Sequence, residues 1–406
     1  MSLIVLKFGG TSVGSIKKIN YVAKIIKKHH HKKNKLIVVS SAMSGVTNDL
    51  IKKSKQISKN FDKFEYDVLL SSGEQIACAL LSGALLKIGL KSRSWLSWQI
   101  PIITKGDHKS SRIISINKKE ILKYVNSGGI PIITGFQGIS NNRRITTLGR
   151  GGSDATAISI AKFFSADDCF IYTDVSGVYT TDPKLNSKAK KIKKISYEEM
   201  LEMASLGAKI MQPISLQDAM INDIDINVRS AFINSNGTTI SNNQQLFNKN
   251  PITGIAFTKN EAKITVTGIP DKPGASANIF GPLADANISV DTIVQNASVE
   301  RMTDLTFTVD RNDLKQALEV VIPVAGAINA RNCVSDEELG KVSIVGTGMQ
   351  NAPGYASKMF RTLSDAEINI EMIATSEIRI TTIIERDQVQ QAVQALHDAF
   401  ELEKTE

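Results

Sequence analysis

The chain has 406 residues, enough for two or three domains, and 42% of them are hydrophobic, which allows a sizeable core. It contains no run of 18 apolar residues and no cleavable signal pattern, so we expect no membrane partner. The three cysteines are scattered and lack a CxxC spacing. They argue against a disulfide framework or a cysteine-ligated metal site, and they fit a reducing cytoplasm.

The net charge of +9 conceals two halves of opposite sign. Residues 1–260 carry 37 Lys and Arg against 18 Asp and Glu, whereas residues 261–406 carry 12 against 22. Two domains of different character are therefore expected to meet near residue 260. A basic half could bind nucleic acid, but its lysines are spread widely and are not interleaved with aromatic residues. A solvated, lysine-rich surface is the simpler interpretation, and we predict no nucleic-acid partner.

The first half alternates short β-branched runs with helical patterns. Strands are predicted at 3–8, 35–40, 130–135 and 168–173, and a helix is predicted over 73–89. This rhythm is typical of a three-layer α/β domain with a mostly parallel sheet, which we place at residues 1–250.

The second half repeats itself. "KITVTGIPDKPG" begins at Lys263 and "KVSIVGTGMQNAPG" begins at Lys341, and the two Pro-Gly pairs lie 80 residues apart. Each copy is predicted to run strand, Pro-Gly loop, helix, strand, strand, helix. Self-similarity of this kind indicates duplicated α+β modules, which we place at 260–335 and 340–406. The N–H groups of a Pro-Gly loop that opens a helix can hold a carboxylate.

The stretch "VLKFGGTSVGS" ends the first predicted strand with Lys7, which would project into the crevice at the carboxyl edge of the sheet. Gly9 and Gly10 allow backbone N–H groups to approach a ligand closely. Thr11 and Ser12 are expected to cap the next helix, whose N-terminus favours anions. No GxxxxGK[ST] motif is present, so a Walker-type site is not supported.

Two further stretches offer similar chemistry. "TTLGRGGSDATA" places three glycines around Arg150, a cap-competent Ser153, and Asp154 in the first helical turn. "YTDVSGVYTTDP" places Thr173 and Asp174 at the carboxyl end of another predicted strand. Two glycine loops, a lysine and two loop aspartates indicate phosphoryl transfer, in which backbone amides and the lysine hold phosphates.

These stretches resemble the aspartate kinases of the amino-acid kinase family. The matching motifs, in order, are "KFGGTSVGS", "VVSSAMSGVTN", "SSGEQ", "TLGRGGSDATA", "YTDVSGVYTTDP" and "EEMLEMASLGAKIMQP", followed by two modules similar to ACT regulatory domains. The resemblance covers nearly the whole chain. "KFGGTS" together with "GRGGSD" distinguishes it from the glutamate, carbamate and nucleoside-monophosphate kinases of the same fold.

The resemblance implies transfer of the ATP γ-phosphate to the β-carboxylate of L-aspartate, with Mg²⁺, giving 4-phospho-L-aspartate for lysine, threonine and methionine biosynthesis. The nucleophile is already an anion, so catalysis would rest on positioning and charge neutralisation. The implied catalytic residues are Lys7 and Asp154. The implied aspartate-binding residues are Ser41, Thr47, Glu74, Arg150 and Ser153. The implied ATP-binding residues are Lys7, Gly9, Gly10, Ser12, Thr173, Asp174, Tyr179, Lys184 and Lys209.

Arg150 resembles the clamp on the substrate α-carboxylate, because a guanidinium fork suits a carboxylate. Glu74 resembles the partner of the substrate ammonium, although a glutamate at a helix start would also satisfy the macrodipole. One segment departs from the family pattern: Ile214 begins Ile-Ser-Leu-Gln where many relatives have Arg-Ser-Val-Glu. This departure leaves open a non-catalytic amino-acid sensor with a decayed kinase domain, whereas the intact Lys7, Arg150 and Asp154 favour the enzyme.

The two ACT-like modules imply feedback control by lysine, threonine or both. ACT modules pair edge to edge, which implies a homo-oligomer. "PDKPG" and "MQNAPG" differ, so the two modules are not expected to bind equivalently. By resemblance, the effector contacts would be Asp271, Gly274, Ser276, Gln295, Asn369 and Ile370.

Overall fold

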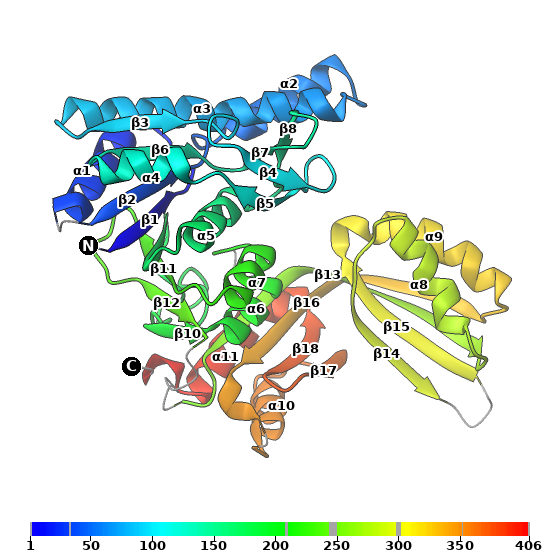
Figure 1. Ribbon diagram of the computed structural model, residues 1–406. Coiled ribbons are helices and arrows are strands. Elements are labelled where there is room, and N and C mark those ends of the chain that lie inside the picture. The colour runs from blue at the N-terminus through cyan, green and yellow to red at the C-terminus, as the bar shows by residue number, and fades with distance from the viewer. Residues whose placement is uncertain are drawn as a thin grey trace.

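The computed structural model describes residues 2–31, 34–207, 210–242, 250–297, 302–350 and 352–404. An N-terminal α/β domain is followed by two smaller modules that share a second sheet (Figure 1). The N-terminal domain holds an eight-stranded sheet of order β10-β12-β11-β9-β1-β2-β6-β3, in which neighbouring strands are parallel except β11 and β12. Its strands are β1 (Leu3–Phe8), β2 (Lys35–Ser40), β3 (Ser92–Trp95), β6 (Ile130–Thr134), β9 (Asp168–Thr173), β10 (Lys194–Ser196), β11 (Ile226–Ser230) and β12 (Thr238–Ser241).

A small sheet of order β5-β4-β7-β8 lies beside the large one. Its strands are β4 (Ile102–Lys105), β5 (Arg112–Ile116), β7 (Gln137–Ile139) and β8 (Ile145–Thr147). The helices of this domain are α1 (Ile16–His31), α2 (Val46–Ile57), α3 (Lys63–Lys87), α4 (Lys119–Asn126), α5 (Gly152–Phe164), α6 (Tyr197–Ser205) and α7 (Pro213–Ile221).

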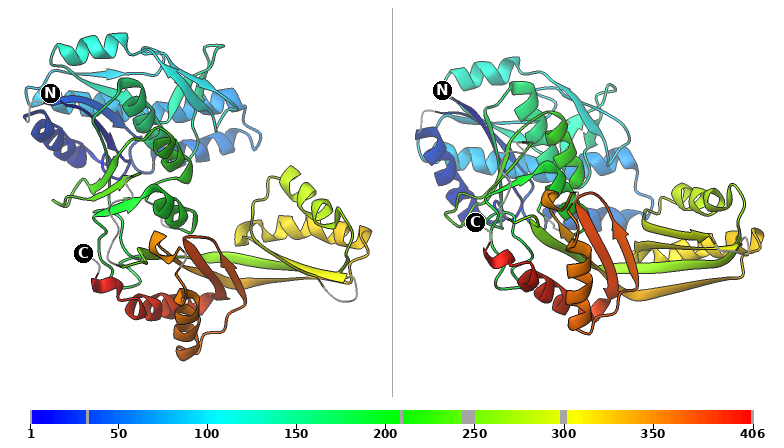
Figure 2. Two further views of the ribbon diagram at one scale, coloured as in Figure 1. Left: turned by 60° about the horizontal axis from the view of Figure 1, so that its bottom comes forward. Right: turned by 90° about the horizontal axis from the view of Figure 1, so that it is seen from below.

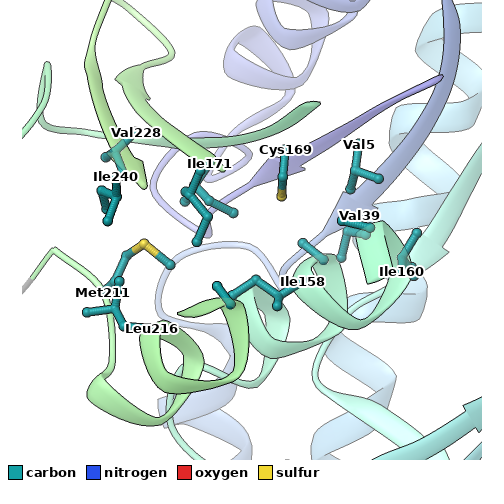
Figure 3. Packing of buried hydrophobic residues seen from close by; sticks show 14 of the residues in the cluster. Val5, Val39, Ile158, Ile160, Cys169, Ile171, Met211, Leu216, Val228 and Ile240 are labelled. Carbon is teal, nitrogen blue, oxygen red and sulfur yellow. The ribbon is translucent and has the colours of Figure 1, made fainter. Parts of the chain in front are cut away.

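The large sheet lies between two helical layers, because successive strand residues point to opposite faces. Leu6 and Phe8 of β1 pack in one buried cluster with residues of α1 and α3. Val5 packs in the other cluster, with residues of α5, α6 and α7 such as Ile158 and Leu216 (Figure 3). The predicted three-layer α/β domain is confirmed, and the four predicted strands appear as β1, β2, β6 and β9.

The predicted helix at 73–89 is longer than expected. α3 begins at Lys63, where the Asp62 carboxylate accepts hydrogen bonds from the N–H groups of Phe64 and Glu65. Buried polar residues, including Asp67 and Glu74, interrupt its apolar pattern. Among the described residues it is the one helix long and apolar enough by composition to cross a membrane. It packs along the sheet through Cys78 and its neighbours, as a core helix does.

The two C-terminal modules share a six-stranded sheet of order β14-β15-β13-β16-β18-β17. Its strands are β13 (Gly254–Pro270), β14 (Val290–Ala297), β15 (Met302–Asp310), β16 (Asn332–Val345), β17 (Met372–Thr375) and β18 (Arg379–Glu385). Their helices are α8 (Ala275–Asp285), α9 (Leu314–Ala327), α10 (Tyr355–Asp365) and α11 (Val389–Ala399). Short 3-10 helices lie at Arg311–Asp313, Thr347–Met349, Arg386–Gln388 and Leu402–Lys404.

The internal repeat is present in three dimensions. α8 and α10 each span 11 residues and begin directly after Gly274 and Gly354. These two glycines have φ of 95° and 105°, a region that favours glycine, which explains why each loop carries one. The predicted order of strands and helices holds in both copies.

Residue 260, where the composition changes, lies inside the long strand β13. Residues 254–258 pair with the end of β16, while residues 261–270 pair with β15. Ile252 and Ile255 accordingly pack with Val342 in the core of the second module. The segment that the sequence reading left between domains therefore belongs to the second module, and the two modules are joined by β13 and β16 (Figure 2).

Candidate active site

The turns after β1 and β2 meet at the carboxyl edge of the large sheet. Ser41 N donates to Phe8 O at 3.1 Å, and Ser44 N donates to Gly10 O at 3.1 Å. A Cβ on Gly10 would lie only 2.8 Å from Ala42 O, so this close approach requires glycine. The turns are thus locked together. The Gly9 N–H donates to Tyr172 O at 3.0 Å, whereas the Gly10 N–H has no partner among the described residues and can bind a ligand.

Lys7 and Asp154 form an ion pair at this edge. Lys7 lies two residues after Val5, so strand alternation directs its side chain to the α5 face of the sheet. There the Lys7 Nζ lies 2.6 Å from Asp154 Oδ1, in the first turn of α5. The two residues are only 7% and 8% exposed. A buried ammonium is costly unless it is paired, and Asp154 supplies the partner.

The glycine loop before α5 is held by its neighbours. Gly149 and Gly151 have φ of 76° and 71°, and Gly151 is the N-cap of α5. A Cβ on Gly151 would lie 2.4 Å from Gln212 Cγ, so the loop packs tightly against the turn before α7. Arg150 is exposed between these glycines and has no hydrogen bond or ion pair within the part of the chain that the structure describes.

Glu74 reaches the same edge from the middle of α3. Its Oε1 accepts a hydrogen bond from Ala42 N at 3.0 Å, while no described residue is a partner for Oε2. Burial raises the pKa of the Glu74 carboxyl to about 7, although the Ala42 N–H acts in the opposite direction. The expected position at a helix start is wrong, because α3 begins 11 residues earlier, at Lys63. The macrodipole therefore does not account for this glutamate.

The expected capping roles are also wrong. α1 begins at Ile16, too far along the chain for Thr11 or Ser12 to cap it, and α5 is capped by Gly151 and not by Ser153. The Ser12 hydroxyl is instead fully buried, with no hydrogen-bond partner among the described residues. Ser153 is packed against Gly135, where a Cβ would lie 2.7 Å from Ser153 Oγ.

Sequence reasoning missed Thr134 at the end of β6. Its hydroxyl is buried at the same sheet edge and lacks a partner within the described ranges. Unpaired buried hydroxyls are rare in proteins and call for an explanation. Together with Ser12 Oγ and Glu74 Oε2, it gives this edge three buried oxygens that can still bind a ligand. The signal available in the sequence was the Thr-Gly pair that closes the strand.

Residues 173–183, from the end of β9 through the loop after it, carry most of the remaining predicted contacts. Thr173 Oγ1 donates to Asp174 Oδ1 at 3.0 Å, and the Tyr179 hydroxyl lies 2.6 Å from Ser176 Oγ. Lys184 is exposed just beyond the loop. Lys209 lies outside the described residues, so its predicted role is not tested.

Ser41 and Thr47 are half-buried, at the end of β2 and in the first turn of α2. Ser44, which lies between them, donates its N–H to Gly10 O, and the predicted aspartate contacts of Ser41 and Thr47 stay a prediction.

The segment that departs from the family pattern forms the start of α7. Ile214 is 40% exposed, whereas Ser215 and Leu216 are fully buried. Leu216 packs in the core on the α5 face (Figure 3). The departure is thus compatible with a packed start of α7.

The second module contacts the loop after β9 directly. Thr180 Oγ1 forms a hydrogen bond with His397 Nε2 of α11 at 3.0 Å, and Ile255 N donates to Thr180 O at 2.7 Å. His397 is fully buried, and burial lowers its pKa. Glu199 of α6 adds a second link, because its Oε1 accepts from Thr253 Oγ1 and from Thr347 N.

The predicted effector residues fall in two places. Ser276 Oγ donates to Gln295 Oε1 at 2.9 Å in the first module, next to the exposed Asp271 and Gly274 loop. Asn369 and Ile370 lie in the second module, where Asn369 Nδ2 donates to Glu371 Oε1 at 3.1 Å. Glu371 in turn forms an ion pair with Lys263 of β13 at 2.8 Å, so the second group lies against the shared sheet.

The described residues contain no group of three His, Cys, Asp or Glu side chains that could hold a metal ion. A metal bound at the sheet edge would therefore need ligands from a substrate. Mg²⁺ is commonly bound in this way, through one or two carboxylates together with phosphate oxygens and water.

Comparison with known proteins shows the family to which the chain belongs. Residues 2–230 match the amino acid kinase family, and residues 263–324 and 342–400 each match an ACT domain. The chain is 46% identical over 404 residues to an aspartate kinase of Stutzerimonas stutzeri and 46% identical over 405 residues to an aspartokinase of Pseudomonas aeruginosa. Both alignments cover 99% of this chain and 98% of the relative.

Two solved structures of Escherichia coli aspartokinase III are similar over 98% of this chain and 99% of theirs. The complex with aspartate and ADP has a TM-score of 0.80 at 27% identity, and the complex with lysine and aspartate has a TM-score of 0.79 at 26% identity. This chain is therefore an enzyme of the amino acid kinase family and belongs to its aspartokinases, with two ACT domains after the kinase domain.

Proposed function

We propose that the protein transfers the γ-phosphate of ATP to the β-carboxylate of L-aspartate, giving 4-phospho-L-aspartate. The observation that carries the proposal is the buried Lys7–Asp154 pair between two glycine loops at the carboxyl edge of the sheet. The E. coli relative that holds aspartate and ADP supports the choice of both substrates. In doubly wound sheets this edge is where ligands bind.

Lys7 supplies positive charge where the transferring phosphoryl group builds up negative charge. No general base is required, since a carboxylate is an anion at neutral pH. The difficulty is bringing this anion against an anionic phosphate, so catalysis consists of positioning and charge neutralisation. Asp154 fixes the Lys7 ammonium, and the Gly10 amide with the unpaired Ser12 hydroxyl binds phosphate oxygens. Gly9 contributes by allowing close approach, because its N–H donates to Tyr172 O at 3.0 Å.

The α-carboxylate and the ammonium group of aspartate are each bound by a side chain of opposite charge. Arg150, exposed and unpaired among the described side chains, receives the α-carboxylate in its guanidinium fork. Glu74 receives the ammonium through the oxygen that has no partner among the described residues. Ser41, Thr47 and Ser153 line the same approach, so the β-carboxylate is left facing Lys7.

The loop at 173–183, with Lys184 beyond it, forms the nucleotide side of the crevice, and we refer to it as the nucleotide loop. Asp174, exposed at the end of β9, and Asp154 are the carboxylates available to Mg²⁺ beside the phosphates. When bound, Mg²⁺ would screen the phosphate charge and orient the γ-phosphate.

We further propose that the ACT domains sense an end product of the lysine, threonine and methionine pathway. The E. coli relative in complex with lysine supports lysine as one such ligand. The edge strands β14 and β17 would pair with a second copy of the chain, giving a homo-oligomer. Three free cysteines suit a cytoplasmic location.

The test is ADP release that depends on aspartate, measured by a coupled assay with ATP and Mg²⁺. Lys7→Ala should lower kcat about 10²- to 10³-fold, as loss of one stabilising donor does elsewhere, while the KM for ATP changes less. Lys17→Ala, which removes an exposed lysine of α1, is the control and should match wild type. A Lys7→Ala enzyme with half the wild-type rate, or ADP release without aspartate, would exclude the proposal.

A further inference from the structure

Asp67 is a fully buried carboxylate outside the proposed active site. Its Oδ2 lies 2.6 Å from His108 Nδ1 and accepts a hydrogen bond from Thr147 N at 3.0 Å. Its Oδ1 accepts a hydrogen bond from Thr147 Oγ1 at 2.7 Å. The Asp67 side chain is 0% exposed and the His108 side chain 11%. An ionised carboxylate is costly to bury without partners. The contacts of Asp67 with His108 and Thr147 therefore indicate that it holds these two segments in a specific arrangement.

The partners of Asp67 all lead to the Arg150 loop. Thr147 ends β8 three residues before Arg150. His108 and Lys109 belong to a loop that packs under the same glycines, because a Cβ on Gly149 would lie 2.8 Å from Lys109 O. The Asp67 carboxylate therefore binds Thr147, at the start of the Arg150 loop, and also His108, in the segment that packs against this loop.

The same helix carries Glu74. Asp67, Ser71 and Glu74 follow the i, i+4, i+7 spacing that places residues on one side of a helix. Ser71 O accepts a hydrogen bond from Gln137 Nε2 of β7 at 2.9 Å, so the β7–β8 hairpin is attached to α3 at two successive turns. One rigid element thus presents Glu74 itself and, through Asp67 and Thr147, fixes the base of Arg150.

We propose that Asp67 is a positioning residue that sets the separation between Arg150 and Glu74 and so fits the site to an amino acid of the size of aspartate. The inference rests on the proposed function, because it takes these two side chains as the partners of the substrate carboxylate and ammonium. Asp67 itself does not contact the substrate. Its removal should loosen aspartate binding and leave nucleotide binding almost unchanged.

The experiment is steady-state kinetics of Asp67→Asn. The amide keeps the size of the carboxylate, but its Nδ2 cannot accept from Thr147 or His108. The KM for aspartate should rise about 10- to 100-fold, as small misplacements of binding groups do, while the KM for ATP stays near wild type. The ratio of kcat/KM for aspartate to kcat/KM for glutamate should fall, because the distance between Arg150 and Glu74 is no longer fixed.

Glu65→Gln is the matched control. Glu65 also links α3 to this hairpin, through an ion pair with Arg144 at 2.6 Å, but the two side chains are 58% and 42% exposed. Its loss should leave both KM values within about twofold of wild type, because exposed pairs contribute little. Equal changes of the KM values in Asp67→Asn and Glu65→Gln would contradict the proposal, because they would show that Asp67 only stabilises the hairpin.

Thr147→Val covers the case in which Asp67→Asn does not fold. It removes the 2.7 Å hydroxyl contact with little change of shape and keeps the backbone contact. A selective rise in the KM for aspartate would support the proposal. KM values for aspartate and ATP that rise together, or neither rising in a folded Thr147→Val enzyme, would overturn it.

Failure of this inference can be separated from failure of the proposed function. Wild-type enzyme that does not phosphorylate aspartate contradicts the function itself. Active wild type with an Arg150→Lys variant that keeps the wild-type KM for aspartate contradicts the clamp, because lysine lacks the guanidinium fork. Wild type and Arg150→Lys that behave as expected, beside unaffected Asp67→Asn and Thr147→Val enzymes, contradict the positioning role alone.

Discussion

Glu74 places its carboxyl group where water cannot stabilise a charge. The residue is 3% exposed, and one of its oxygens has no protein partner among the described residues. Desolvation outweighs the Ala42 N–H bond, so the pKa of the carboxyl rises to about 7. An arriving ammonium would restore the missing interaction, and this makes Glu74 the residue whose protonation should control substrate binding.

The KM for aspartate should therefore depend on pH. Protonated Glu74 cannot pair with an ammonium, so the KM should rise as pH falls through about 7 and approach a tenfold increase per unit well below it. At saturating aspartate the bound ammonium favours the ionised carboxylate, so kcat should hold to lower pH than kcat/KM. Kinetics between about pH 5.5 and about pH 8.5 measure both, within the range where few other side chains titrate.

Glu74→Gln is the control for this profile. It should have a high KM for aspartate that does not vary with pH across the same range. A wild-type KM that stays constant through pH 7, or a Glu74→Gln profile that matches the wild-type profile, would contradict the assignment of Glu74 as the ammonium partner.

Single residues were predictable where a motif places them at a strand end. Lys7 and Asp154, the two residues expected to be catalytic, lie together, because strand alternation and the first turn of α5 leave little freedom. The contribution of Asp67 was not predictable, because it depends on partners far along the chain. His108 and Thr147 lie 41 and 80 residues from Asp67. The capping roles of Thr11 and Ser12 failed because the turn after β1 continues to Ser15 before α1 begins.

At the scale of elements, compact apolar strands were predicted well and long mixed elements poorly. β1, β2, β6 and β9 are short β-branched runs with buried faces, so the local pattern suffices. The start of α3 was missed because buried polar residues break its apolar period. The strand before the first Pro-Gly loop was predicted, but the start of β13 at Gly254 was missed, because residues 254–258 pair with a part of β16 that follows more than 80 residues later.

α11 is attached to the nucleotide loop through Thr180, whose hydroxyl bonds His397 Nε2 and accepts from Lys190 N, both at 3.0 Å. Thr180→Val should destabilise the protein by about 1–3 kcal/mol, because His397 is left buried without this partner. It should also raise the KM for ATP more than that for aspartate, since the loop lines the nucleotide side. Urea unfolding and steady-state kinetics measure the two effects.

The neighbouring Thr181→Val is a matched control for that change. The Thr181 hydroxyl is buried and has no partner in the described part of the chain, so its removal should be neutral or slightly stabilising. Equal destabilisation by the two valines would show that the Thr180–His397 contact contributes nothing specific.

At the scale of the whole molecule, the two ACT domains lie in different positions. The second lies against the kinase domain, through Glu199, the Arg379–Glu202 ion pair and His397 (Figure 1). The first stands away from it, joined by β13 and β16, in every view (Figure 2). At the junction of these strands a buried Lys341 pairs with Glu261 at 2.7 Å. A signal from the first ACT domain would therefore travel through the shared sheet.

Asp271→Ala tests control of activity without touching the kinase domain. Asp271 is exposed in the Pro-Gly loop, where we propose that it holds the effector ammonium. An effector must bind one conformation better than the other to inhibit. Loss of this contact should raise the half-inhibitory concentration about 10- to 150-fold, as expected for a charge-assisted hydrogen bond, with basal activity unchanged.

Inhibition curves for lysine and threonine, alone and together, measure that shift. Asp285→Ala, at the far end of α8, is the control and should leave the curves unchanged. Identical curves for Asp271→Ala and wild type would place the effector elsewhere.

The most direct measurement for the central claim identifies the product. An acyl phosphate reacts with hydroxylamine to give a hydroxamate, so wild-type enzyme, ATP, Mg²⁺ and aspartate should yield β-aspartyl hydroxamate in amounts equal to the ADP released. Lys7→Ala should yield almost none. ADP release without hydroxamate, or a hydroxamate at the α-carboxylate, would contradict the account.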